Sequence, residues 1–159
     1  MSRFTGGAAR TSRTSAPASE LHFVTFHLGH WEYGIEVADV CGIYHGLAII
    51  PAPDEPDTIA GEVHLPTHRI RVIDLRRLLQ LPESESPGWM LVVGAVDGPI
   101  GILVDRVTEV IRVRSDAMAA YEDADGRVPG EKFLTVMAQY QGRTIYVPDV
   151  HRMLRECRG

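Results

Sequence analysis

Gly61–Leu79 reads GEVHLPTHRIRVIDLRRLL, and its pattern of apolar and polar residues indicates the fold. Apolar and polar residues alternate at the start of segment 70–75, a pattern typical of a β-strand with one buried face. Leu75–Leu79 then continues as a short helical segment that Leu81-Pro82 closes. Asp74 stands at the junction, where a carboxylate can accept hydrogen bonds from the first free N–H groups of a helix. We therefore expect a strand, a capping aspartate and one short helix.

The same pattern recurs later in the chain, which indicates an internal duplication. Ile70-x-Val72-x-Asp74-Leu75-x-Arg77-Leu78-Leu79 returns, at a constant offset of 75 in the numbering, as Ile145-x-Val147-x-Asp149-Val150-x-Arg152-Met153-Leu154. Gly34-Ile35-x-Val37-x-x-Val40-x-x-Ile43 returns, at an offset of 67, as Gly101-Ile102-x-Val104-x-x-Val107-x-x-Val110. The two offsets differ by eight, so the second copy should carry about that much additional loop, within Ala117–Lys132. Asp149 is then expected to cap the second helix as Asp74 caps the first.

Each copy contains a hairpin, a third strand, a loop, a second hairpin and a short helix. The predicted fold class is all-β, with two pseudo-repeated five-stranded barrels of the SH3 or OB type packed side by side and only short helices. Residues 1–20 are predicted to be a disordered tail, 21–86 a first subdomain and 87–159 a second. The C-terminal segment could pack back on the first subdomain. The Ser- and Arg-rich tail also resembles an organelle transit peptide, but it lacks the amphipathic helical period that supports one.

Composition excludes several classes of protein. No apolar run approaches the roughly 20 residues needed to cross a bilayer, and the start lacks the apolar core of a secretion signal. Cys41 and Cys157 form no CxxC pair, which suits a reducing cytoplasm. Residues 1–19 hold three of the 16 basic residues and no acid, so residues 20–159 carry 13 basic against 21 acidic residues. Such an acidic body repels phosphate backbones, and we expect no nucleic-acid binding.

The sequence offers no catalytic or metal-binding pattern. His64 and His68 are four positions apart, but Pro66 between them prevents the helix on which that spacing would bring two ligands together. No glycine-rich phosphate loop, nucleophile elbow or Cys/His pairing is present. A basic cluster is formed by Arg69, Arg71, Arg76 and Arg77. Arg69 and Arg71 would face the same way in an alternating strand, which favours a solvated face over a patch for an acidic partner. We therefore expect no catalytic residue, no metal and no cofactor.

Several motifs resemble the CheW-like domain family. They are Pro51-x-Pro53-x-x-Pro56-x-x-Ile59-x-Gly61, Val72-Ile73-Asp74-Leu75-Arg76, Phe26-x-Leu28-Gly29-x-x-x-Tyr33-Gly34-Ile35 and Gly101-Ile102-Leu103-Val104-Asp105-x-Val107-x-x-Val110. The family pattern is a Pro-rich segment, then Ile-x-Gly-Val-Ile-Asn-Leu-Arg-Gly and Pro-Val-Ile-Asp-Leu-Arg. The resemblance covers nearly everything from Leu21 to Leu154. It implies a fold of two five-stranded barrels. It also implies that the protein is a non-catalytic adaptor of bacterial chemosensory arrays, and that it is located in the cytoplasm, at membrane-associated receptor arrays.

The resemblance also implies partners and a site. Family members couple the cytoplasmic tips of chemoreceptors to the regulatory domain of a CheA-type histidine kinase, and they contact other CheW-like domains. Carried over to this chain, the groove that receives the receptor helix would include Val40, Ile43, Val107 and Val110. Short aliphatic side chains at threefold spacing suit an amphipathic helix, and they suit a barrel core equally well. The alternative function is a CheW-like module of another signalling or motility system that binds a kinase or regulator without receptor contact.

Two departures from the family pattern concern charged groups. Val40-Cys41-Gly42-Ile43 stands where the family has Val-x-Glu-Ile, and His64-Leu65-Pro66-Thr67 stands where it has Asn-Leu-Arg-Gly. Losing both members of a charged pair disrupts less than losing one. Gly42, Pro66 and Thr67 therefore mark a surface on which receptor coupling should be altered. Introducing Gly42→Glu together with Pro66→Arg is expected to strengthen receptor binding.

Overall fold

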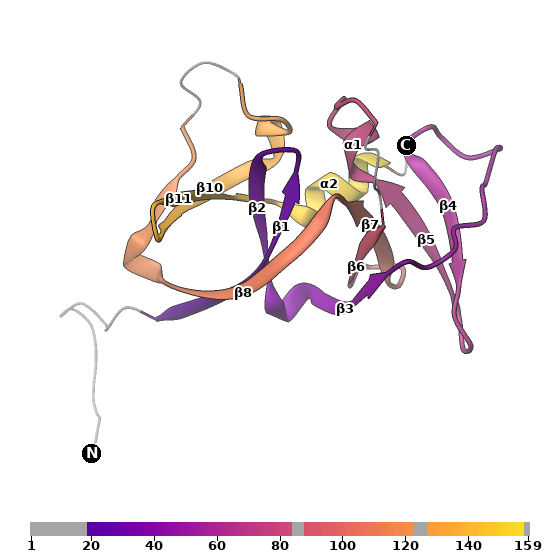
Figure 1. Ribbon diagram of the computed structural model, residues 1–159, viewed down its shortest axis with the longest axis horizontal. Helices are drawn as coiled ribbons and strands as arrows, with labels where there is room; N and C mark the ends of the chain where they lie inside the picture. The colour runs from indigo at the N-terminus through magenta and orange to yellow at the C-terminus, as the bar shows by residue number, and fades with distance from the viewer. Residues whose placement is uncertain (1–18, 84–87, 123–126, 158–159) are drawn as a thin grey trace.

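The computed structural model describes residues 19–83, 88–122 and 127–157, and Figure 1 shows two β-sheets side by side. The six-stranded sheet has the order β8 (Arg106–Arg114), β1 (Glu20–Leu28), β2 (Trp31–Glu36), β11 (Arg143–Pro148), β10 (Leu134–Tyr140), β9 (Met118–Ala120). The five-stranded sheet has the order β3 (Val40–His45), β6 (Trp89–Val93), β7 (Ile100–Val104), β5 (Arg69–Asp74), β4 (Ile59–His64). The predicted all-β class, with two repeated sheets side by side, is confirmed.

Helices are few and short in the described part of the chain. They are α1 (Leu75–Leu78), α2 (Val150–Cys157) and the 3₁₀ turns Val37–Asp39, Ser115–Ala117 and Glu131–Phe133. None of these could cross a membrane, because none is long and apolar enough. The six-stranded sheet has one strand more than expected, since the short strand β9 pairs with β10. Most of the predicted tail, residues 1–18, lies outside the described residues, and its last residue, Glu20, already begins β1.

The two copies of the repeat exchange strands. The first copy places β1 and β2 in the six-stranded sheet and β3, β4 and β5 in the five-stranded one. The second copy does the reverse, with β6 and β7 in the five-stranded sheet and β8, β10 and β11 in the other. The predicted subdomains, 21–86 and 87–159, therefore do not correspond to the two sheets. The chain crosses between sheets at the Val37–Asp39 turn and returns at Asp105, so each sheet needs strands from both halves.

Strand registers show the same duplication position by position. Ile43 of β3 lies opposite Leu91 of β6, and its counterpart in the second copy, Val110 of β8, lies opposite Val24 of β1. In the second hairpins, the pair Gly61↔Val72 of β4 and β5 has its counterpart in the pair Val136↔Val147 of β10 and β11. One parallel pair in each sheet joins the copies, β5 with β7 and β11 with β2. The similarity between the copies therefore extends to strand pairing.

The largest hydrophobic core lies between the sheets and is built by both. Val24, Phe26 and Ile35 enter it from the six-stranded sheet, and Leu91 and Ile102 enter it from the five-stranded sheet. Each sheet buries its opposite face over a smaller cluster of its own, which includes Phe23 and Ile145 in one sheet and Val72 and Met90 in the other. Strands β1, β2, β6 and β7 are thus buried on both faces, which explains the near-continuous apolar run that begins at Met90.

Helix α2 closes the shared core from one side. It follows β11 of the six-stranded sheet, and it contributes the buried residues Val150, Met153, Leu154 and Cys157 to that core. Leu154 and Cys157 line a small gap together with Ile59 and Ile73 of the five-stranded sheet. The C-terminal segment therefore contacts strands that come from the first half of the chain (Figure 1).

Because both sheets share one core, we predict a single cooperative unfolding transition. Phe26→Ala removes a fully buried ring that stacks on Tyr33 at 5.6 Å between centroids. It should lower the free energy of unfolding by about 3–5 kcal/mol. Urea titrations of Trp31→Phe and Trp89→Phe variants, each of which retains a tryptophan in a different sheet, should give coincident midpoints. Separate midpoints would contradict the shared core.

The matched control is Val96→Ala, at a side chain that is 95% exposed. A truncation of exposed apolar surface should change the free energy of unfolding by no more than about 0.5 kcal/mol.

Candidate functional site

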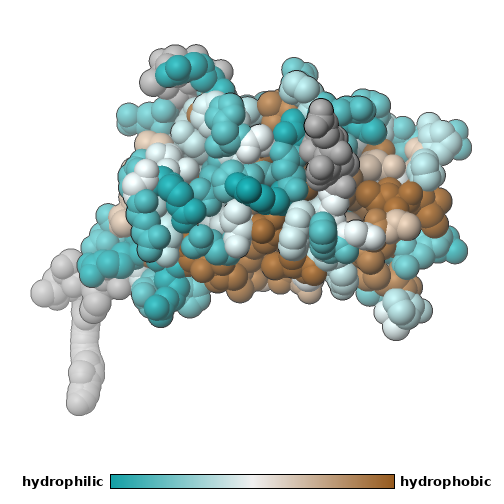
Figure 2. Space-filling model, in the orientation of Figure 1, coloured by the Kyte–Doolittle hydropathy of each residue, from teal (hydrophilic) through white to brown (hydrophobic). Residues whose placement is uncertain are grey.

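An apolar surface runs over the edge strands β3 and β8, and we call Val40, Ile43, Val107 and Val110 the β3–β8 surface. Ile43 is 42% exposed and Val110 60% exposed, the largest exposures in the set. Val40 and Val107 are half-buried and pack against the shared core. Figure 2 shows hydrophobic surface along the lower edge of the molecule, in the region where Figure 1 places β3 and β8. The surface is thus a continuation of the core to solvent.

Matching β-bulges explain the threefold spacing of these residues. Cys41 is the additional residue where β3 pairs with β6, because Val40 lies opposite Val93 and Gly42 opposite Val92. Thr108 is the corresponding residue where β8 pairs with β1. A bulge shifts the alternation by one position, so side chains three apart lie on the same face. The threefold spacing of these residues therefore belongs to bulged strands and not to a helical turn.

Cross-strand neighbours determine which face this is. Ile43 lies opposite Leu91 and Val110 lies opposite Val24, and both of these opposite residues belong to the shared core. Directly opposite residues point to the same side of a sheet. The two exposed side chains therefore lie on the faces that bound the core, at its solvent edge. The sequence left open whether these four residues belong to the core or to a contact surface. Val40 and Val107 pack against the core, whereas Ile43 and Val110 are exposed.

Asp74 and Asp149 lie where the helices begin and accept backbone hydrogen bonds. The Asp74 carboxylate accepts from the N–H groups of Arg76 and Arg77, at 3.0 and 3.4 Å. The Asp149 carboxylate accepts from the N–H group of Arg152 at 3.1 Å. Both aspartates hold free donors of a first helical turn, as the repeat predicts.

The residues that depart from the family pattern lie apart in the fold. Gly42 is in β3, whereas Pro66 and Thr67 form the turn between β4 and β5, at the other edge of the strand order. A Cβ at position 42 would lie 2.8 Å from Cε2 of Tyr44, so any side chain there requires that ring to move. The Thr67 hydroxyl contacts Nδ1 of His68 at 2.8 Å. Gly42→Glu would therefore change the packing of Tyr44 as well as the charge.

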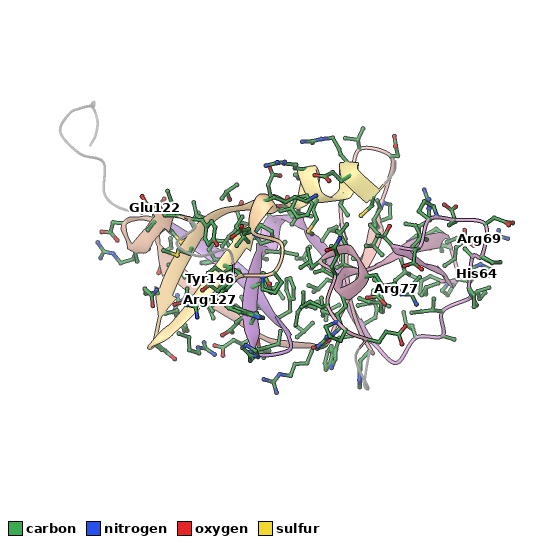
Figure 3. The ribbon with its side chains drawn as sticks, turned by 90° about the horizontal axis from the view of Figure 1, so that it is seen from above. His64, Arg69, Arg77, Glu122, Arg127 and Tyr146 are labelled. Atoms are coloured by element: carbon green, nitrogen blue, oxygen red, sulfur yellow. The ribbon has the colours of Figure 1, made fainter. Side chains whose placement is uncertain are left out.

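The basic cluster does not form a patch of unpaired cations. Arg71 contacts Glu55 at 2.7 Å, Arg77 contacts Asp74 at 3.5 Å, and Arg76 pairs with Asp105. Arg69 is exposed at the start of β5, directly opposite His64 (Figure 3).

The two histidines considered as metal ligands have other contacts. His64 ends β4 and contacts Glu62 at 3.1 Å, and His68 lies in the following turn. Across residues 19–83, 88–122 and 127–157, the side chains of His, Cys, Asp and Glu form no group of three or more that could hold a metal ion.

One polar feature inside the six-stranded sheet could not be found from the sequence. Glu32 is only 6% exposed, and it lies opposite His27 in the register of β1 and β2. Its carboxylate is 4.0 Å from His27 Nε2 and 3.5 Å from the Arg143 guanidinium. Arg143 also reaches Glu109 of β8 at 3.5 Å. Strand alternation alone predicts inward-facing residues here, but it does not predict that ionisable groups from four strands meet.

An ion pair between Arg76 and Asp105 is the second feature that sequence reasoning missed. The guanidinium donates from Nε to Asp105 Oδ1 at 2.7 Å and from a second nitrogen to Oδ2. Both side chains are largely buried, with 16% and 19% exposed. A bidentate Arg–carboxylate pair of this kind is strong and directional. The only signal in the sequence is the presence of an acid at the end of β7 and an arginine in the helical turn.

The fold and the surface define a class: a β-rich module with no metal cluster in its described residues and with apolar residues exposed on two edge strands. The family model of the CheW-like domain matches residues 22–158, and the chain belongs to that family.

Individual relatives and one solved structure agree with this assignment. The chain is 26% identical over 140 residues to chemotaxis protein CheW of Treponema pallidum (84% of this chain, 82% of that one). It is 25% identical over 150 residues to chemotaxis protein CheW of Klebsiella aerogenes (93% and 90%). The structure of the scaffolding protein TtCheW from Thermoanaerobacter tengcongensis matches with a TM-score of 0.75 at 22% identity, over 85% of this chain and 92% of that chain. This structural match supports the fold.

The histidine beside Glu32 leads to a prediction about pH. Burial lowers the pKa of His27; Arg106 and Arg143 also lower it, and Glu32 and Asp105 oppose them. The unfolded chain has an ordinary histidine pKa of about 6.5, so it binds a proton at a higher pH than the folded chain does. The free energy of unfolding should fall as the pH is lowered below about 6.5 towards the folded-state pKa. Urea titrations between about pH 5 and pH 8 measure this slope.

His27→Gln should reduce that slope in this interval, because it removes the group whose protonation differs between the two states. His30→Gln, at an exposed position in the β1–β2 turn, is the control and should retain the wild-type slope. An unchanged slope in His27→Gln would contradict the assignment.

Proposed function

We propose that this protein is a non-catalytic adaptor of bacterial chemosensory signalling, which couples the cytoplasmic tips of chemoreceptors to a CheA-type histidine kinase. The β3–β8 surface is the contact for the receptor helix. The observation that carries this proposal is the exposure of Ile43 and Val110 at equivalent positions of two copies, on faces continuous with the shared core. Family membership and the names of the relatives, chemotaxis protein CheW, support the signalling context.

The physical fit concerns the shape and chemistry of the surface. An amphipathic helix presents apolar side chains at spacings of three and four positions, and it binds to shallow apolar surfaces with few charges. The half-buried Val40 and Val107 provide the floor of such a surface, and Ile43 and Val110 stand beside them. No step of bond making or breaking is needed, because coupling requires only that both partners bind at once. The protein would act in the cytoplasm, at membrane-associated receptor arrays.

A second candidate function follows from Gly42, Pro66 and Thr67. The family places a Glu and an Arg near these positions, and this chain has neither. Such a module could bind a kinase or regulator of another signalling or motility system without touching a receptor. The two candidates differ in one measurement, which is the binding of a receptor fragment.

We predict that Ile43→Arg and Val110→Arg each lower the affinity for a cytoplasmic-tip fragment of the organism's own chemoreceptors by at least about tenfold, or about 1.4 kcal/mol. A guanidinium in an apolar contact must either lose its hydration or hold the partner helix away. Isothermal titration calorimetry with the fragment, and in parallel with the regulatory domain of the kinase, measures both affinities.

Val96→Arg is the matched control, since it introduces the same charge at an apolar residue that is 95% exposed and lies outside the surface. Its affinity should equal that of the wild type. Wild-type affinity in both surface variants would exclude the β3–β8 surface as the contact. A wild-type chain that binds the kinase domain but no receptor fragment would support the second candidate function.

A further inference from the structure

The two sheets are tied together at one of the crossovers by a compact polar clamp. Asp105 is the single residue between β7 of the five-stranded sheet and β8 of the six-stranded sheet. Its carboxylate pairs with Arg76 of α1, which follows β5, and it accepts from the N–H group of Gly29 at 2.6 Å in the β1–β2 turn. We call Arg76, Asp105 and Gly29 the crossover clamp. It joins a helix on one sheet to a hairpin of the other.

Further hydrogen bonds leave the clamp little freedom. The Asp105 N–H group donates to the carbonyl of His27 in β1 at 3.1 Å, and another nitrogen of Arg76 donates to the Pro82 carbonyl at 2.6 Å. The hydrogen bonds with Asp105 raise the pKa of the Arg76 guanidinium above its already high value, so the guanidinium stays charged. Gly29 has a φ of +61°, which favours glycine in this turn. Side chains and backbone thus fix the crossover together.

The other crossover provides an internal comparison. His151 occupies the position in the second copy that corresponds to Arg76 in the first, and it faces Asp39 in the Val37–Asp39 turn between β2 and β3. His151 Nε2 and Asp39 Oδ1 are 3.8 Å apart, and both side chains are well exposed, at 52% and 36%. An exposed pair with this separation contributes little to the stability of the fold. The position that corresponds to Asp105 is Ala38, so the bidentate clamp is not repeated, and the other crossover has only this weak contact from the neighbouring Asp39.

We propose that Arg76 and Asp105 are positioning residues that fix the orientation of β8, and with it the six-stranded sheet, relative to the five-stranded sheet that carries β3. This inference rests on the proposed function, because its consequence is that Val107 and Val110 are held in register with Val40 and Ile43 for one partner helix. Neither clamp residue belongs to the β3–β8 surface. β8 begins directly after Asp105, so any rotation there moves Val110 relative to Ile43.

The orientation can be measured without any partner. Spin labels on Arg69→Cys of β5 and Gln139→Cys of β10, both at exposed positions in different sheets, report the distance between the sheets by double electron–electron resonance. Cys41 is exposed and is replaced by serine, and Cys157 is buried. Asp105→Asn should broaden or shift the distance distribution. Arg76→Lys, which keeps the charge but loses the bidentate geometry, should give an intermediate result.

The functional readout is the affinity for the chemoreceptor fragment compared with that for the kinase regulatory domain. Asp105→Asn should lower the first by about tenfold and leave the second near its wild-type value. A mere loss of folded protein lowers both in proportion, so the ratio separates positioning from unfolding.

Two controls break other ion pairs. Asp116→Asn removes the exposed bidentate pair with Arg114, at 2.7 and 3.0 Å, near the end of β8. His151→Ala removes the contact with Asp39 at the other crossover. Both should leave the distances and both affinities unchanged.

Each outcome decides the proposal. An unchanged distance distribution in Asp105→Asn would overturn it, and so would a broadened distribution with unchanged receptor affinity. If the wild-type chain binds no receptor fragment, the proposed function fails, and the distance measurement alone then decides whether the clamp orients the sheets.

Discussion

The hydrophobic core between the two sheets is the constraint on which the rest of the structure depends. Each sheet takes strands from both copies of the repeat, so neither copy can complete a sheet alone. Strands β1, β2, β6 and β7 bury both faces, because one face contacts the opposite sheet and the other covers a smaller cluster. Strand exchange thus joins two similar sequences around one core, and it leaves the edge strands β3 and β8 at matching positions beside that core.

Those edge strands show how a binding surface can arise from the same pattern as a core. The bulges at Cys41 and Thr108 keep side chains three positions apart on one face, so the inner valines contact the core and the outer Ile43 and Val110 reach solvent. Exposed apolar residues on edge strands favour aggregation unless a partner covers them. Under the proposed function, the receptor helix would cover Ile43 and Val110.

The two copies have diverged where charge is concerned. In the six-stranded sheet His27 and Glu32 bring ionisable groups into the interior, whereas Gly94 and Pro99 occupy the corresponding positions of the second copy. At the crossovers, Arg76 and Asp105 form a largely buried pair, whereas His151 and Ala38 occupy the corresponding positions and form no such pair. Apolar positions repeat because both halves build one core, and charged positions differ because each serves a particular contact. The pseudo-symmetric frame is therefore fixed firmly at one crossover only.

The sequence by itself determined the class and the repeat. Alternation, turn residues and the two offsets predicted the strands, the short helices and the capping roles of Asp74 and Asp149, because these depend on near neighbours in the chain. The tertiary structure alone decided that the copies exchange strands, that Ile43 and Val110 differ in exposure from Val40 and Val107, and that Arg76 meets Asp105. Spacing along the chain predicts which side chains share a face. Which face is buried depends on strands that are distant in the sequence, such as β1 and β8, which pair although they come from opposite halves of the chain.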